Sequence, residues 1–195
     1  MDPNFAILTL PYSQLQSRAC TEGFRELADA LEGQVEVLEA PPMFEELVRA
    51  QRIIHMTEAH HAFDRLGFVG SPDLSGILAK MLEEGKNLAQ NEYEEALKIK
   101  ASAESFFQSF FEDFDAILSP SASGEAPLLS EKHTGNPIFC TVWTLAGLPT
   151  LNLPIMQGEN GLPIGLQMVG RLRDDARLLR TARWFMTTLF DEGEA

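Results

Sequence analysis

Proline and glycine punctuate residues 141–171 so densely that no continuous helix can span them. Three prolines fix φ and remove backbone donors there, while five glycines permit turns or close approach of the backbone. Between these breaks lie two short apolar runs, Leu151–Ile155 and Leu166–Val169, each preceded by a Gly-Leu-Pro turn. Short apolar runs bounded by turns are typical of strands buried on both faces. The segment therefore predicts two buried strands.

The beginning of the chain alternates between strand and helix patterns. The apolar run Phe5–Leu10 predicts a strand ended by Pro11, and Ser13–Leu31 has the spacing of a helix. A second strand is expected at Val35–Leu38. A β-α-β order favours parallel pairing of the two strands with a right-handed crossover.

The rest of the chain is mostly helical by its apolar spacing. We expect a stripe of phenylalanines on the longest helix to pack in the core, and Arg173, Arg177 and Arg180 to form a solvated stripe on the last one. The helices are predicted at Met43–Leu66, at Leu74–Glu84 with Gly85 as its stop, at Glu92–Phe114, and from a cap at Asp174 to Leu189. A strand is predicted at Asp115–Ser119, and a loop follows over Pro120–Asn136. Together these elements predict an α/β fold, with a mixed or mostly parallel sheet flanked by helices, in a single domain over residues 1–195.

The charge and composition exclude several classes of function. The formal net charge is −14, which disfavours attraction to nucleic acid or to an anionic membrane. Only two cysteines occur, so a reducing, cytoplasmic location is expected. No apolar run is long enough to cross a bilayer, and the N-terminus does not look like a secretion signal. Neither a dinucleotide nor a phosphate-binding glycine motif is present, and no cofactor is predicted.

Three groups of residues could carry chemistry, and each has a simpler interpretation. Histidines cluster around Glu58 between His55 and His61, yet one helix supplies too few ligands, so a polar helix face is favoured over a metal site. Ser121 and His133 could form a hydrolase pair, but turn chemistry explains a serine-rich loop equally well without a nucleophile elbow. Cys140 is expected to be a small buried residue rather than a nucleophile.

Several short motifs, in order, resemble one known family. Trp143-Thr-Leu-Ala-Gly-Leu-Pro, then Asn-Leu-Pro, then Gly161-Leu-Pro-Ile-Gly-Leu-Gln-Met-Val-Gly170 are similar to the C-terminal signature of the amidase signature family. Phe114-Asp-Ala-Ile-Leu-Ser-Pro120 resembles the family's strand and loop that come earlier. The resemblance covers nearly the whole chain, but only the C-terminal half of a family member, and it implies a partial amidase-signature fold.

The resemblance also indicates what this chain contributes and what it lacks. Family members hydrolyse amides with a lysine, a serine in a cis-peptide-linked bridge and a nucleophilic serine, and no match to these motifs is found here, so no catalytic residue is assigned. Phe139, Thr141 and Trp143 match the segment beside the family's acyl-binding pocket, which implies a substrate-lining role, although core packing would explain the two aromatic residues equally well. Gln167 matches a family glutamine, and we expect it to satisfy buried backbone.

Two functions remain open from the sequence. The first is the C-terminal portion of an amide hydrolase, which forms a substrate-pocket wall and is inactive alone. It would act on a small amide only when completed by an N-terminal catalytic half. The second is a non-catalytic binding or assembly module that forms a homodimer or pairs with a catalytic half, because a truncated sheet would expose an unpaired strand edge. Whether the chain is itself an enzyme stays undecided.

Overall fold

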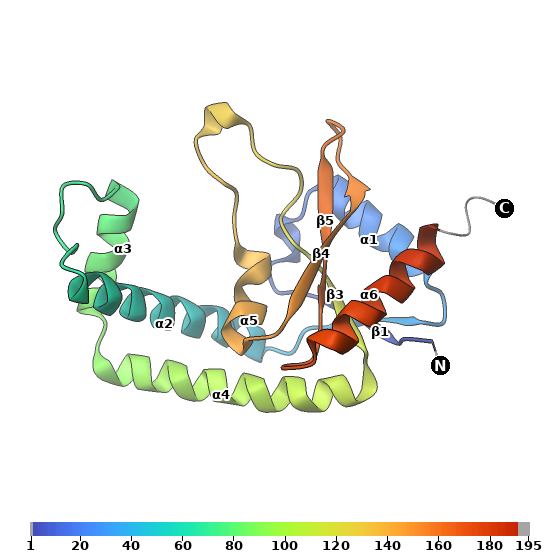
Figure 1. Ribbon diagram of the computed structural model, residues 1–195, viewed down its shortest axis with the longest axis horizontal. Coiled ribbons are helices and arrows are strands. Elements are labelled where there is room, and N and C mark those ends of the chain that lie inside the picture. The colour runs from blue at the N-terminus through green and yellow to red at the C-terminus, as the bar shows by residue number, and fades with distance from the viewer. Residues whose placement is uncertain (1, 191–195) are drawn as a thin grey trace.

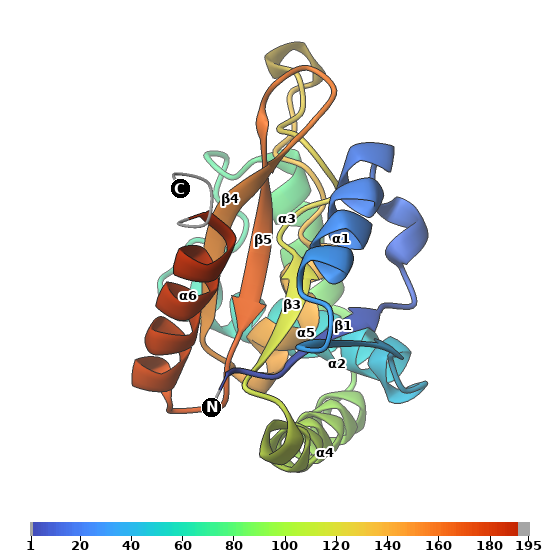
Figure 2. The ribbon, with the colours of Figure 1, turned by 90° about the vertical axis from the view of Figure 1, so that its right-hand side faces the viewer.

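A five-stranded sheet lies between two layers of helices in the computed structural model, which describes residues 2–190 (Figures 1 and 2). The sheet has the strand order β2-β1-β3-β5-β4. Its strands are β1 (Phe5–Thr9), β2 (Val35–Glu39), β3 (Ala116–Pro120), β4 (Thr150–Gln157) and β5 (Pro163–Val169). The helices are α1 (Arg18–Ala30), α2 (Met43–Arg65), α3 (Gly76–Asn87), α4 (Gln90–Asp113), α5 (Ile138–Ala146) and α6 (Asp175–Phe190), with short 3-10 helices η1 (Ser13–Leu15) and η2 (Leu129–Glu131).

The sheet is mixed, which confirms the predicted α/β class. Strand β1 pairs in parallel with both β2 and β3, as the β-α-β order predicted for the first pair. Strand β5 runs antiparallel to both β3 and β4. Pro154 lies in β4 at the edge of the sheet, where its missing N–H removes no central ladder bond. The ladder between β4 and β5 shifts register between Leu153 and Met156, on either side of this proline.

Two apolar cores form on opposite faces of the sheet because successive strand residues point to opposite sides. Leu8 and Ile117 face the side covered by α2, α4 and α5. Phe5 and Leu118 face the side covered by α1 and α6, where Phe5 meets the Phe185 ring edge-on at a centroid distance of 5.6 Å. The central strands β1, β3 and β5 are therefore buried on both faces, as the apolar runs Phe5–Leu10 and Leu166–Val169 predicted for β1 and β5. The expectation of a buried strand at Leu151–Ile155 was wrong, because β4 is an edge strand whose residues are exposed or half-buried.

Helices α2, α3 and α4 reach away from one face of the sheet (Figures 1 and 2). Helices α2 and α4 pack against each other, and α3 packs on α2. Phe107 and Phe111 of α4 are fully buried, which confirms that the phenylalanine stripe packs in the core. No helix within residues 2–190 combines the length and the apolar character needed to cross a bilayer.

Two predicted helix boundaries were wrong for identifiable reasons. The helix expected at Ser13–Leu31 is divided, because Ser17 has extended backbone and its side chain accepts a hydrogen bond from the amide of Cys20, so α1 begins after it. The expected helix stop at Gly85 is instead inside α3, because this glycine lies at the contact with α2.

Candidate functional site

Helix α5 carries the three residues that the sequence assigned to a substrate pocket. Phe139 and Trp143 are buried and face the core between α5, α2 and α4. Trp143 meets the rings of Phe44 and Phe107 at centroid distances of 6.1 and 5.7 Å. The two aromatic residues therefore fix the position of α5, and Gly147, at φ 67°, ends the helix in a left-handed conformation.

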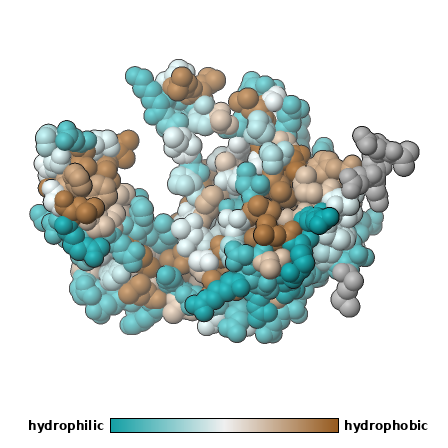
Figure 3. Space-filling model, in the orientation of Figure 1, coloured by the Kyte–Doolittle hydropathy of each residue, from teal (hydrophilic) through white to brown (hydrophobic). Residues whose placement is uncertain are grey.

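Thr141 lies on the other side of α5, where it lines a groove of about 650 Å³. The structure thus separates Thr141, which borders open space, from Phe139 and Trp143. The apolar part of the groove comes from α2, α3 and the start of α5, namely Val48, Met56, Ile77, Met81, Pro137 and Ile138. Figure 3 shows a hollow between α3 and the chain segment around η2. A volume of this size falls within the usual range for small-molecule sites, about 300–1,000 Å³.

A row of polar side chains crosses the sheet beside α5. Gln167 pairs in register with Ser119 on one side and with Asn152 on the other. The Gln167 side-chain amide donates to the Phe139 carbonyl oxygen at 3.3 Å, which confirms its predicted role in satisfying buried backbone. A methyl group at Gly165 would overlap the side chains of Asn152 and Ser121 as they lie, so the glycine gives these two side chains their room.

Tyr12 and Cys140 are neighbours at the edge of this site. The Tyr12 ring packs edge-on against Phe139 at a centroid distance of 5.5 Å, and no described residue bonds its hydroxyl group. Burial raises the pKa of the Tyr12 phenol, and the nearby Cys140 thiol adds to the rise. Burial also raises the pKa of the Cys140 thiol, whose Sγ lies 3.5 Å from the Ser121 carbonyl oxygen. A raised pKa keeps this thiol protonated and therefore a weak nucleophile near neutral pH.

The serine and histidine of the alternative hydrolase pair do not bond each other. The Ser121 hydroxyl donates to the Gly165 carbonyl oxygen at 3.0 Å. His133 lies 3.1 Å from a Glu131 carboxylate oxygen through Nε2, and its Nδ1 accepts from the Gly135 amide at 3.0 Å. Both ring nitrogens are thus engaged within the loop, as expected for turn chemistry.

The histidine cluster of α2 also has local partners. Glu58 accepts a hydrogen bond from the Tyr93 hydroxyl of α4 at 3.0 Å, and the His60 and His61 rings lie 5.9 Å apart. Within residues 2–190, no three histidine, cysteine or acidic side chains gather closely enough to hold a metal ion.

Sequence reasoning missed one contact that shapes the neighbouring loop. The Glu125 carboxylate accepts hydrogen bonds from the Asn160 side chain at 2.7 Å and from the Asn160 and Leu162 amides at 3.0 and 2.9 Å. The Asn160 side chain, followed by the two backbone donors, holds the pKa of Glu125 below its ordinary value. This carboxylate ties the loop after β3 to the β4–β5 turn. No signal in the sequence links positions so far apart.

Comparison with known proteins supports the resemblance seen in the motifs. A family model described as Amidase matches residues 4–179. A glutamyl-tRNA(Gln) amidotransferase subunit of Cupriavidus necator is 41% identical over 100 residues, which cover 48% of this chain and 20% of that protein.

Solved structures share the fold at lower identity. A crystal structure of an amidase matches with a TM-score of 0.81 at 21% identity, over 96% of this chain and 46% of its own length. The corresponding amidotransferase subunit of Thermotoga maritima matches with a TM-score of 0.65 at 22% identity, over 95% of this chain and 42% of its own. This chain therefore spans less than half the length of these proteins. Because the family model matches most of its residues, the chain belongs to the amidase family, the amidase signature family that its motifs resemble.

Proposed function

We propose that this chain forms a wall of the substrate pocket in an amide hydrolase of its family. The observation that carries the proposal is the groove beside α5, because it is bordered by the segment whose sequence resembles the family's acyl-binding region. In this proposal Thr141 contacts the substrate, while Phe139 and Trp143 hold the helix that presents it. The substrate is a small amide.

We also propose that the chain does not hydrolyse amides by itself. The family's lysine and serine motifs have no counterpart in the sequence, and the side chain of Ser121 already donates to backbone. A nucleophile, its base and the oxyanion donors supply most of the acceleration in such enzymes, with one oxyanion donor worth about two to three orders of magnitude. Completion by a catalytic half would supply these groups. The Cupriavidus relative is a subunit by name, which is compatible with a chain that works with a partner.

Turnover measurements test both parts of the proposal. The purified chain should release no ammonia or amine from simple amides above the buffer rate. A Ser121→Ala variant, purified in parallel, separates genuine turnover from contamination, since activity that disappears with the serine belongs to the chain.

Co-expression with the N-terminal segment of a family member should yield a complex with amidase activity. Thr141→Val should then raise KM more than it lowers kcat. Turnover by the chain alone that Ser121→Ala abolishes would overturn the proposal.

A second candidate, an assembly module, is favoured by one feature of the sheet. Strand β2 lies at an edge and pairs only with β1 among the described residues, and its Val37 side chain is 61% exposed. An exposed edge with an apolar side chain is a surface for strand pairing. A second copy could pair there, although each copy also places Glu36 and Glu39 at the same edge.

Sedimentation distinguishes the candidates. If the edge drives association, the chain should sediment as a dimer at tens of micromolar, and Val37→Lys should return it to a monomer. A chain that remains monomeric over this range would remove the assembly module from consideration and leave the pocket-wall function untouched.

A further inference from the structure

The groove beside Thr141 has a charge opposite to that of the protein as a whole. The chain carries a formal net charge of −14. The groove is lined by Arg49, Arg52 and Lys80 and by a single carboxylate, Glu84, so its formal charge is +2 with His55 neutral. Like charges gathered in a concave, partly apolar surface strengthen the local potential. The lining of the groove is therefore positive in a protein that is strongly negative overall.

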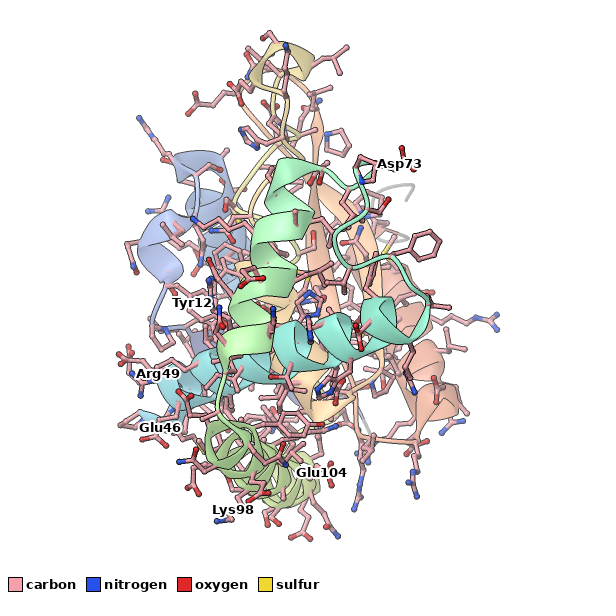
Figure 4. The ribbon with its side chains drawn as sticks, turned by 90° about the vertical axis from the view of Figure 1, so that its left-hand side faces the viewer. Tyr12, Glu46, Arg49, Asp73, Lys98 and Glu104 are labelled. Carbon is pink, nitrogen blue, oxygen red and sulfur yellow. The ribbon has the colours of Figure 1, made fainter. Side chains whose placement is uncertain are left out.

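Ion pairing leaves part of this positive charge available. Arg52 Nη2 lies 2.7 Å from a Glu84 carboxylate oxygen, and Lys80 Nζ lies 4.0 Å from the other oxygen. Arg49 makes no ion pair with any residue in the described range 2–190, including Glu46 one turn earlier on α2 (Figure 4). Its guanidinium group presents several donors in a planar fork that matches a carboxylate.

The same groove also offers apolar surface to a bound molecule. Ile77 of α3 is 87% exposed, and Val48 and Met81 line the groove with it. An inorganic anion would contact the cations and leave these side chains in water. An anion attached to an aliphatic body would use both kinds of surface, because burying apolar area contributes about 25 cal/mol per Å².

We propose that this groove binds an organic anion, a carboxylate carried on a short aliphatic body, and that Arg49 is its principal charged contact. Anion binding itself does not depend on the proposed function, but the role of the anion as a substrate rests on it. The pocket wall would then select amides with a carboxylate at the end away from the reacting bond. The amide end would lie toward Thr141, which lines the same groove.

Binding of matched probes to the whole chain tests the proposal without any turnover. Adipamic acid carries a carboxylate and an amide, adipamide carries two amides on the same body, and inorganic phosphate carries charge without the body. Titration followed by NMR or calorimetry should give adipamic acid a Kd about tenfold lower than that of adipamide, as expected for one charge-assisted contact. Raising the salt concentration should weaken adipamic acid selectively.

Matched variants locate the contact. Arg49→Gln should raise the Kd of adipamic acid about tenfold and leave that of adipamide unchanged. Lys98→Gln removes one positive charge from an exposed position on α4 and should change neither Kd (Figure 4). Any of three results would overturn the proposal: adipamic acid and adipamide bind with equal Kd, Arg49→Gln and Lys98→Gln have equal effects, or phosphate binds as tightly as adipamic acid. Loss of anion binding would leave the turnover tests of the pocket wall unaffected, so the two proposals fail separately.

Discussion

Gly85 of α3 lies against the backbone carbonyl group of Met56 in α2, at a place where even a methyl group would overlap the carbonyl. Both residues are buried, and both helices line the groove beside Thr141. The shape of the groove therefore depends on the close approach that this glycine permits.

Gly85→Ala should destabilise the protein by about 1–3 kcal/mol, because backbone atoms cannot move aside as a flexible side chain can. Urea unfolding gives the free energy, and hydrogen exchange in α3 shows whether the helix has separated from α2. Gly76→Ala is the control, since it begins the same helix and nothing lies within 4 Å of its added methyl group. That variant should be neutral or slightly stabilising. Equal stability of the two variants would show that the helices tolerate the methyl group.

Gly85 also shows why the sequence predicted most elements and misjudged some of their details. A glycine after a helical run usually marks a stop, and only the neighbouring helix reveals that this one permits contact. Helix α5 was not predicted because the prolines and glycines around residues 147–163 dominate the local pattern, whereas tertiary packing of Phe139 and Trp143 determines the helix. The inner strands β1, β3 and β5 were predictable because their apolar runs reflect burial on both faces, a property of local sequence. The edge positions of β2 and β4, which leave both strands partly exposed, follow only from the strand order of the sheet.

Arg177 of α6 is the exception in the expected solvated arginine stripe, since Arg173 and Arg180 are exposed as predicted. Its Nε and Nη2 atoms donate to one Asp115 carboxylate oxygen at 3.1 and 2.6 Å. The other oxygen of Asp115 accepts from the Asn4 amide at 2.9 Å. The pair is about one-third exposed and joins α6 to the starts of β1 and β3. The spacing of arginines along a helix cannot reveal a partner 62 residues earlier.

A double-mutant cycle with Asp115→Asn and Arg177→Gln should give a coupling energy of about 1–2 kcal/mol. The pair is partly shielded from water, and two hydrogen bonds join its members. The same cycle on Arg18 and Glu22, an exposed pair one turn apart in α1, should give about 0.5 kcal/mol or less. Thermal or urea unfolding of the four variants in each cycle measures both. Equal coupling in the two cycles would mean that shielding adds nothing to the Asp115 contact.

The site could be predicted only in part, and the physical reason is specific. The motif around Phe139, Thr141 and Trp143 identifies a segment, but a motif does not state which side chains of a short helix face the core. The structure places only Thr141 on the groove, and it adds Arg49, Arg52 and Lys80 from helices that no motif singled out. Groove residues from separate helices meet only through tertiary packing.

Glu125 should control the order of the loop that leads to α5. Glu125→Ala removes the three hydrogen bonds to Asn160 and Leu162, so exchange of these two amide protons should accelerate several-fold. Glu159→Ala changes the charge of the same turn without removing those bonds and serves as the control. Because the folded pKa of Glu125 is lowered, its contribution is present above the ordinary carboxyl pKa and is lost as the pH falls through the lowered value. Protection that is unchanged in Glu125→Ala would contradict this account.

Cys20 should make the folded state sensitive to alkali. Its side chain is fully buried in α1, and burial raises the pKa of the thiol from 9.0 to about 11. A raised folded pKa means that the stabilising contribution is complete below the unfolded value and is lost as the pH rises from 9.0 to about 11, because only the unfolded state releases the proton in that window. The loss approaches about 2–3 kcal/mol.

Cys20→Ala should be less stable at pH 7 through lost packing, but its stability should fall less steeply above pH 9 than that of the wild type. Tyr12 and Cys140, whose pKa values are also raised, contribute to both proteins and cancel in the comparison. Urea unfolding at several pH values measures the difference, and parallel curves for the two proteins would show that Cys20 does not titrate as its burial requires.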